Sequence, residues 1–412
     1  MTAAGRWIVM IVLGLSGTII YLLPFLSEIF YQPLQQALGS TNTQLGAMMS
    51  VFGITSLVSY LLGGWAADRL EPRPLITSSL ILTGLLGFVF ATFPSYPVAL
   101  VVHGLWGITV TGMMWGALIK ATRDWAPASD QGKAFGFLEA VRGLSQAVIV
   151  SILIWVFAQI GGDVSAFGSV VMIISALHIM LGLVSWSVVA PGKTSNDQSS
   201  RSTSAEFKAA LRMPVVWLIS IIIFASYSAY WGGRYFTPYA SQSFGLTVIV
   251  AAAIGTIRMW VRPVPSAAAG YIADRFGIWQ TVAVCFVGMI ISFALFAAIP
   301  GNPGLVAAMI INIVLVSIFL FAQRGVYFAL LEEGGVPPAI TGTAIGVISM
   351  IGYSPDIFMP LIAGMLLDKY PGAPGYQFFF ALITGLCVAG LIATLMVGRM
   401  HKAKSLQSNI MI

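Results

Sequence analysis

Charged residues are scarce in this 412-residue sequence: Asp, Glu, Lys and Arg make up 8% of it, whereas apolar residues make up 58%. Soluble domains carry about 25% charged residues, so the composition excludes a soluble globular protein. Cysteine is rarer still, because Cys285 and Cys387 are the only two and both lie inside apolar runs. This pattern argues against a disulfide or a metal site, and we expect both thiols to be packing residues.

The apolar residues form runs of about twenty residues or more, which is long enough for a helix to cross a bilayer. In lipid, backbone polar groups must be bonded within the protein, which leaves helices or closed barrels. The alternating ten-residue segments of a barrel are not seen, so the sequence predicts an all-α membrane protein. The twelve expected transmembrane helices cover residues 7–31, 43–67, 74–93, 96–121, 132–158 and 166–190, and then 213–242, 247–272, 279–299, 303–331, 339–367 and 375–399.

A polar segment rich in Ser and Thr, from Pro191 to Lys208, separates the sixth expected helix from the seventh. Such a composition is typical of a flexible linker. The sequence therefore indicates an N-terminal six-helix bundle over residues 1–190, a linker over 191–212, and a C-terminal six-helix bundle with a short tail over 213–412.

Basic residues are distributed unequally between the two sides of the membrane. Fourteen Lys and Arg residues fall in the termini, the linker and the loops of one side, whereas the opposite side has only Lys369. Because cytoplasmic loops are enriched in Lys and Arg, we expect both termini and the linker in the cytoplasm of a cell with this protein in its inner membrane. The net charge of +6 reflects this bias, and no nucleic-acid partner is expected.

One short charged loop occurs twice in the chain. The segment GGWAADRLEPRP has Gly64 four residues before Asp68, and AGYIADRFG repeats this spacing with Gly270 and Asp274, 206 residues later. An arginine follows the aspartate in both copies. A repeat at half the length of the chain, joining apolar segments, indicates a duplicated membrane protein.

With this loop the sequence resembles the major facilitator superfamily, in which G-x-x-x-D-R-x-G-R-R marks the loop between helices 2 and 3; the resemblance covers nearly the whole chain. The matching positions are Gly64, Asp68, Arg69 and Arg73 in the first copy and Gly270, Asp274, Arg275 and Gly277 in the second. Glu71 departs from the pattern, and the second copy lacks the trailing basic residues. The resemblance implies two pseudo-symmetric six-helix bundles and a cytoplasmic latch at this loop; a simple turn is the alternative.

Eight ionisable residues fall inside the expected helices: Glu28, Glu139, Asp356, Arg142, Arg234, Arg258, Arg262 and Arg324. A charge near the bilayer centre costs at least about 2.5–3.5 kcal/mol, so these groups should face the interior or a wet cavity. Five bases against three acids leave a surplus of two positive charges. The surplus favours an anionic substrate, because guanidinium groups bind carboxylates and phosphates with two parallel hydrogen bonds.

The candidate substrate-binding residues are Arg142, Arg234, Arg258, Arg262, Arg324, Tyr21, Tyr230 and Trp231. Arg258 and Arg262 are four residues apart on one helix face, where two guanidinium groups repel unless an anion bridges them. The resemblance adds that helices 5 and 8 line the central cavity, which places Arg142 and Arg258 or Arg262 near a shared site. The aromatic residues have ordinary packing as their alternative role.

The acids have competing interpretations. Glu139 is the first candidate for proton coupling, but it is three residues from Arg142 and the two could simply satisfy each other. Asp356 is the second candidate; it follows Pro355, which can kink the helix, and it could instead be a partner for an arginine. Glu28 is close to the outer end of the first helix, where we expect an interfacial position rather than a coupling role.

We therefore expect a secondary transporter that moves a small organic anion by alternating access as a proton-coupled symporter, acting as a monomer in the lipid bilayer. An exporter or antiporter of drugs or phosphorylated metabolites is the alternative, although the fifth helix lacks the Gly-Pro pair of drug/proton antiporters. A membrane-embedded enzyme or a non-transporting sensor is a remote alternative. No nucleophile or metal constellation is recognisable, and His103 and His178 are isolated, so we expect no enzyme activity, cofactor or metal.

Overall fold

The structure is a computed structural model that describes all residues except 1–2, 127–130, 191–203, 338–339 and 411–412. Side chains are not described for 3–6, 61–62, 64–68, 131–132, 204–206 and 404–410 either. The described residues form helices joined by turns, with no strand among them. Ten of the described helical segments are long and apolar enough to cross a membrane. With α1 (Ala3–Ile19) and α4 (Asn42–Arg69), they account for the twelve predicted spans.

The chain divides into two compact units. Unit 1 comprises residues 1–197, 246–260 and 360–368, and unit 2 comprises 198–245, 261–359 and 369–412. Each unit therefore follows one half of the sequence, except that two short segments of the second half belong to unit 1. The sequence-based division at residues 190 and 213 remains a prediction.

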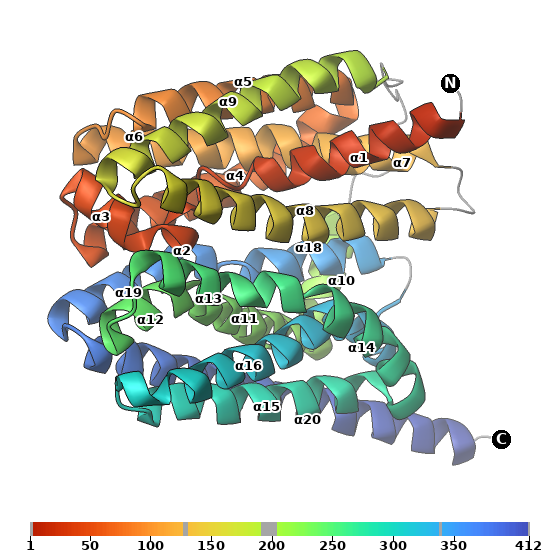
Figure 1. Cartoon of the computed structure of the whole chain (residues 1–412). Helices are drawn as coiled ribbons and strands as arrows, with labels where there is room; N and C mark the ends of the chain where they lie inside the picture. Colours follow the sequence, from red (N-terminus) through yellow and green to blue (C-terminus); the bar gives the residue numbers. More distant parts are fainter. Residues whose placement is uncertain (1–2, 127–130, 191–203, 338–339, 411–412) are drawn as a thin grey trace. The chain divides into compact units, whose positions relative to one another are not determined.

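The helices of unit 1 after α1 are α2 (Leu26–Ile29), α3 (Tyr31–Leu38), α4, α5 (Pro72–Phe90), α6 (Tyr96–Gly107), the π-helical segment η1 (Ile108–Trp115), α7 (Gly116–Trp125), α8 (Gln131–Gln159), α9 (Val164–Val188) and most of α13 (Val248–Val261). Helices α5 and α9 lie side by side (Figure 1). Glycines allow this close approach, because a Cβ atom on Gly84 would lie 2.7 Å from the carbonyl oxygen of Ser175. Small residues at such contacts let helix backbones pack closely in a membrane.

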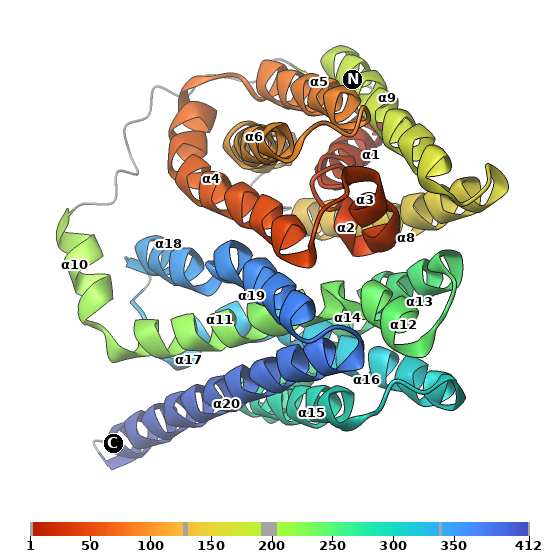
Figure 2. The ribbon, with the colours of Figure 1, turned by 90° about the vertical axis from the view of Figure 1, so that its left-hand side faces the viewer.

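The helices of unit 2 are α10 (Ser204–Arg212), α11 (Pro214–Arg234), α12 (Phe236–Phe244), α14 (Pro263–Phe276), α15 (Ile278–Ala298), α16 (Val306–Val326), α17 (Leu330–Glu333), α18 (Thr341–Gly352) and α20 (Ala373–Ile410). Two short 3-10 segments, Pro303–Leu305 and Tyr327–Ala329, precede α16 and α17. Helix α20 packs against both α15 and α11 (Figure 2). The last helix to be named, α19 (Pro355–Lys369), begins in unit 2 and continues in unit 1.

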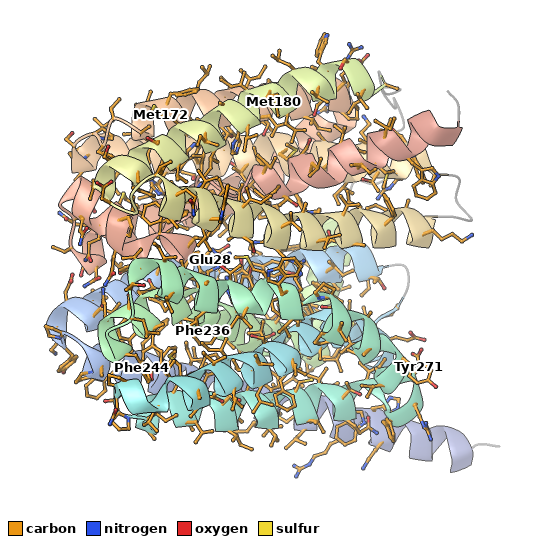
Figure 3. The ribbon with its side chains drawn as sticks, in the orientation of Figure 1. Glu28, Met172, Met180, Phe236, Phe244 and Tyr271 are labelled. Carbon is orange, nitrogen blue, oxygen red and sulfur yellow. The ribbon has the colours of Figure 1, made fainter. Side chains whose placement is uncertain are left out.

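Apolar side chains occupy both the interior and the outer surface, as expected in a membrane. Phe236 and Phe244 are buried inside unit 2. Met172, Met180 and Tyr271 point outward and are 47%, 55% and 74% exposed (Figure 3). An outer surface of this kind suits contact with lipid rather than with water.

Among the described residues, four predicted spans contain a non-helical break. The first is interrupted over residues 20–25, the seventh at Tyr235, the eighth at Arg262 and the eleventh at residues 353–354. Pro263 and Pro355 each begin the helix that follows a break, because proline lacks the N–H that a helix interior requires. A break in the helix lies directly before Pro355, where the sequence suggested that the proline can kink it.

Candidate functional site

The candidate site of unit 2 is built on one face of α11. Tyr227, Tyr230, Trp231 and Arg234 lie at relative positions 0, 3, 4 and 7, which fall on the same side of a helix. The rings of Tyr227 and Tyr230 stack with centroids 5.7 Å apart. Trp231 is buried, whereas the two tyrosines and Arg234 are half-buried. This face therefore presents aromatic surface and one guanidinium group together.

Asp356 lies against this face. It occupies the first turn of α19, directly after the break at residues 353–354. The Tyr227 hydroxyl donates to Asp356 Oδ2 at 3.1 Å, and Trp231 Nε1 donates to Oδ1 at 2.8 Å. The break and these two bonds hold the carboxylate on the aromatic face of α11.

Two arginines pack on the same tyrosine ring. The Arg234 guanidinium lies 5.0 Å from the centroid of Tyr230 and 4.6 Å from that of Trp231. Arg324, from α16, lies 4.4 Å from Tyr230 and 5.5 Å from Tyr227. Cations placed over aromatic faces at these distances are attracted to the ring electrons. Tyr230 therefore brings two positive charges together beside Asp356.

Arg324 has a donor that meets no acceptor. Its Nη1 is buried and has no hydrogen-bond partner among the described residues. Its neighbour Gln323 is fully buried, and neither its Nε2 nor its Oε1 has a partner within the same described set. Buried polar atoms without partners are costly, so such a cluster is a natural place for a bound polar ligand.

Arg262 and two further tyrosines extend the site. Arg262 lies 5.9 Å from the ring of Phe321, and that ring is 6.4 Å from Tyr230. The hydroxyl groups of Tyr327 and Tyr353 are 3.1 Å apart, and the Tyr353 ring is 4.9 Å from Tyr227. We call the set Tyr227, Tyr230, Trp231, Arg234, Arg262, Phe321, Arg324, Tyr327, Tyr353 and Asp356 the arginine–tyrosine cluster.

The sequence prediction missed four members of this cluster. Tyr227, Phe321, Tyr327 and Tyr353 were not among the candidates. The helical spacing of Tyr227 with Tyr230 and Trp231 was a usable signal, because residues three and four apart share a helix face. The other three come from separate elements and carry no comparable local signal.

Arg142 has both polar and aromatic neighbours in unit 1. It forms an ion pair with Glu139, and its Nε donates to the Gly17 carbonyl oxygen at 3.2 Å. Its guanidinium also lies 5.2 Å from the Trp115 ring. The pairing of Glu139 with Arg142, one of the two interpretations of the sequence, is therefore present. The Glu139 side chain is nevertheless 47% exposed, against 15% for Arg142.

Arg258 is paired as well. It is buried in α13 and forms an ion pair with Glu28 of α2, whose side chain is 7% exposed. Arg258 thus has a carboxylate neighbour, and Arg262 lies beyond the end of α13 beside Phe321. The predicted stacking of Arg258 on Arg262, with an anion shared between them, remains a prediction. Glu28, expected at the interface, has its side chain buried against Arg258.

Tyr21 lies in the broken segment between α1 and α2. It is half-buried, and its ring centroid is 6.1 Å from that of Phe25. The matched depth of Tyr21 and Tyr230 in the two halves remains a prediction, as does a role for Tyr21 in binding.

The predicted cytoplasmic latch is only partly described. The surroundings of Gly64 and the side chain of Asp68 are not described, whereas Arg69 is exposed at the end of α4. The Arg73 guanidinium lies 4.2 Å from the Trp186 ring. Asp274 and Arg275 are exposed at the end of α14. The latch role of this loop therefore remains a prediction.

The cysteines and histidines behave as ordinary interior residues. Cys285 and Cys387 are buried and free. His103 Nδ1 lies 2.9 Å from the Ala99 carbonyl oxygen, and His178 Nδ1 lies 2.8 Å from that of Ile174. These are contacts within single helices, as expected. The described residues contain no group of three or more His, Cys, Asp or Glu side chains that could hold a metal ion.

Comparison with known proteins identifies relatives along the whole chain. The sequence profile of the Major Facilitator Superfamily matches residues 6–360. The inner membrane protein YqcE of Escherichia coli is 30% identical over 396 residues, which cover 94% of this chain and 93% of YqcE. The inner membrane protein YihN of the same organism is 29% identical, with 95% of both chains covered.

More distant relatives have names that state a substrate. The hexuronate transporter of Bacillus subtilis is 22% identical over 94% of this chain and 93% of its own. Among solved structures, a mutant of the nucleoside transporter NupG superposes with a TM-score of 0.79 at 16% identity, covering 95% of this chain and 99% of NupG. At that identity the likeness shows the fold alone.

Proposed function

Because this chain belongs to the Major Facilitator Superfamily, we propose that it is a secondary transporter that carries a small organic anion across the inner membrane by alternating access. The observation that carries the proposal is the placement of Arg234 and Arg324 over one ring, that of Tyr230. Both guanidinium groups lie within 5.0 Å of the centroid of that ring, and a bound anion would offset their combined positive charge. One relative is named as a hexuronate transporter, and a hexuronate is an organic anion.

The distribution of charge supports an anion site in unit 2. Of the eight intramembrane charges, four form the pairs Glu28–Arg258 and Glu139–Arg142 in unit 1, and each pair sums to zero. The remaining four are Arg234, Arg262, Arg324 and Asp356, all in unit 2, so their sum is three minus one, or +2. An organic anion brings the opposite charge into this region.

Proton coupling requires an acid, because arginine stays protonated at any working pH. Asp356 is the acid of the arginine–tyrosine cluster, and it accepts hydrogen bonds from Tyr227 and Trp231. We therefore place it first as the coupling group and Glu139 second. The anion and the proton would then act on the same cluster, which is what symport requires.

The orientation is part of the same proposal. The excess of Lys and Arg on one side favours cytoplasmic termini, a cytoplasmic linker at 191–212, and a cytoplasmic latch at Asp68 and Asp274. We also propose that the protein works as a monomer.

Uptake by proteoliposomes tests the function. Purified protein would be assayed with radiolabelled hexuronates, sulfonates and dicarboxylates, with a matched neutral sugar as control, and with and without an inward proton gradient. We expect accumulation of at least one anion that the gradient enhances.

A pair of matched variants tests the site. Arg324→Lys keeps the charge but loses the planar fork, and hydrogen bonds to charged groups contribute about 1.5–3 kcal/mol. We therefore expect KM to rise about 10- to 100-fold. Arg212→Lys, at an exposed position at the end of α10, should leave KM unchanged. Uptake of a neutral compound that is insensitive to replacement of Arg234, Arg262 and Arg324 would refute the proposal.

A further inference from the structure

The glycine–aspartate spacing of the repeated loop occurs a third time, at the end of α19. Gly364 is followed four residues later by Asp368, and a basic residue, Lys369, comes next. A small residue, Ala363, precedes the glycine, as in the other two copies. This third copy, AGMLLDK, lies near the end of the eleventh span, where the sequence predicts the side of the membrane opposite the first two copies.

The structure shows what the carboxylate of this third copy does. Asp368 Oδ1 accepts from the backbone N–H of Asn42 at 3.0 Å and from Asn42 Nδ2 at 2.8 Å. Asp368 Oδ2 accepts from the backbone N–H of Thr43 at 2.8 Å. These N–H groups belong to the first turn of α4, where a helix has no internal acceptors and carries partial positive charge. Asp368 therefore caps α4 from another helix.

The cap is part of a small network. The Asn42 side-chain oxygen, Oδ1, accepts from the Tyr31 hydroxyl at 2.8 Å and from Gln35 Nε2 at 3.0 Å, both on α3. Asn42 is thereby held with its amide nitrogen toward Asp368. The three helices α3, α4 and α19 are joined through one asparagine.

Glycines allow the two helices to approach at this point. A Cβ atom on Gly364 would lie 2.8 Å from Thr43 Cα, and one on Gly46 would lie 2.8 Å from the carbonyl carbon of Pro360. Neither position has room for a larger residue unless a backbone moves. The carboxylate and the two glycines thus form one close contact between α4 and α19.

We propose that Asp368, with Gly364 and Gly46, is a second latch that holds α19 closed on α4 at the end of α4 opposite Asp68. Helix α4 begins at Asn42 and ends at Arg69, so the two latches act on its two ends. Since α4 belongs to the first six-helix half and α19 to the second, alternating access requires this contact to break in each cycle. The proposal rests on that family mechanism and does not depend on the charge of the substrate.

Cysteine accessibility tests the latch without any substrate. Ser50 is 6% exposed and lies one turn beyond Gly46 on the same face of α4. A Ser50→Cys protein in which Cys285 and Cys387 are replaced by alanine would be labelled with a membrane-impermeant maleimide. Labelling would be followed separately in whole cells and in inside-out vesicles, so that an error in the predicted orientation changes only the side from which labelling occurs.

Asp368→Asn is the test variant. It removes the negative charge and replaces the oxygen that accepts from the Thr43 N–H by an NH2 group, which cannot accept. Asp163→Asn is the matched control: Asp163 Oδ1 caps α9 at the Ala166 N–H, 2.8 Å away, within one half of the sequence. We expect Asp368→Asn to speed labelling about 5- to 30-fold and Asp163→Asn to change it less than 2-fold.

A second variant covers the case in which Asp368→Asn does not accumulate. Asn42→Ala removes one donor to Asp368 and keeps the backbone cap, so labelling should increase by a smaller factor. Unchanged labelling in the Asp368 variant, or equal increases in the Asp368 and Asp163 variants, would overturn the proposal. If anion uptake fails while the accessibility result holds, the proposed substrate is wrong and the latch stands.

Discussion

Replacing Glu28 by glutamine is expected to destabilise unit 1 more than any other single loss of charge in the membrane. Glu28 and Arg258 form an ion pair whose side chains are 7% and 5% exposed. Arginine cannot shed its proton, so Glu28→Gln leaves Arg258 charged without this carboxylate. The reverse change, Arg258→Gln, leaves a carboxyl group that can neutralise itself by protonation. The two variants should therefore differ, with Glu28→Gln the more harmful.

The magnitude follows from the burial of the pair. Removing one partner of a buried ion pair costs about 3–5 kcal/mol, whereas exposed pairs contribute about 0.2–1 kcal/mol. Glu139–Arg142 provides the comparison inside the same unit, because the Glu139 side chain is 47% exposed. We expect Glu28→Gln to lower the free energy of unfolding by about 3 kcal/mol or more, and Glu139→Gln by less than about 1 kcal/mol.

Equilibrium unfolding in mixed detergent micelles measures these differences. The double variant Glu28→Gln/Arg258→Gln completes a cycle, and its coupling energy should be at least about 1.5 kcal/mol. At low pH the Arg258→Gln protein should recover part of its stability, because Glu28 becomes neutral when it is protonated. A coupling energy below about 0.5 kcal/mol, within which independent mutations usually add, would refute the reasoning.

Three further predictions concern transport and orientation. Asp356→Asn should abolish accumulation driven by a proton gradient while exchange of substrate continues; gradient-driven uptake by that variant, lost instead in Glu139→Gln, would move the coupling role to Glu139. Asp68→Asn should slow turnover more than it weakens substrate affinity, since a latch acts on one conformation; unaltered turnover would leave the loop as a simple turn. Single cysteines at Ser195 or Ser405 should resist labelling from outside intact cells, and external labelling at either would reverse the orientation.

The helices were predictable because lipid imposes one strong rule. Each span must bond its own backbone, so long apolar runs become helices whatever their neighbours are. Breaks within the spans were harder to predict from the sequence. Pro355 signalled its own break, whereas the π-helical segment at residues 108–115 contains no proline. There the Ser79 hydroxyl donates to the Thr109 carbonyl oxygen at 2.7 Å, a long-range bond that competes with the regular helix pattern.

The intramembrane charges were predictable as a set, but their partners were not. The spacing of Arg258 and Arg262 suggested two groups that share one anion. The structure gives Arg258 a carboxylate from Glu28, 230 positions earlier in the chain. Such a long-range partner leaves no trace in local spacing. The Glu139–Arg142 pair could be predicted because its two residues are only three positions apart.

The partner of each arginine indicates which arginines are suited to binding. Arg142 and Arg258 direct donors to carboxylates, and a donor used in this way is not offered to a ligand. Arg324 lies over the faces of Tyr227 and Tyr230. A ring stabilises the guanidinium through its flat side, so the N–H groups at the edge of the cation stay directed away from the ring. For Arg324 this includes a buried Nη1 that meets no acceptor among the described residues. A transporter needs such an arrangement, because the charge must be stabilised when the site is empty and still be able to bind the anion when it arrives.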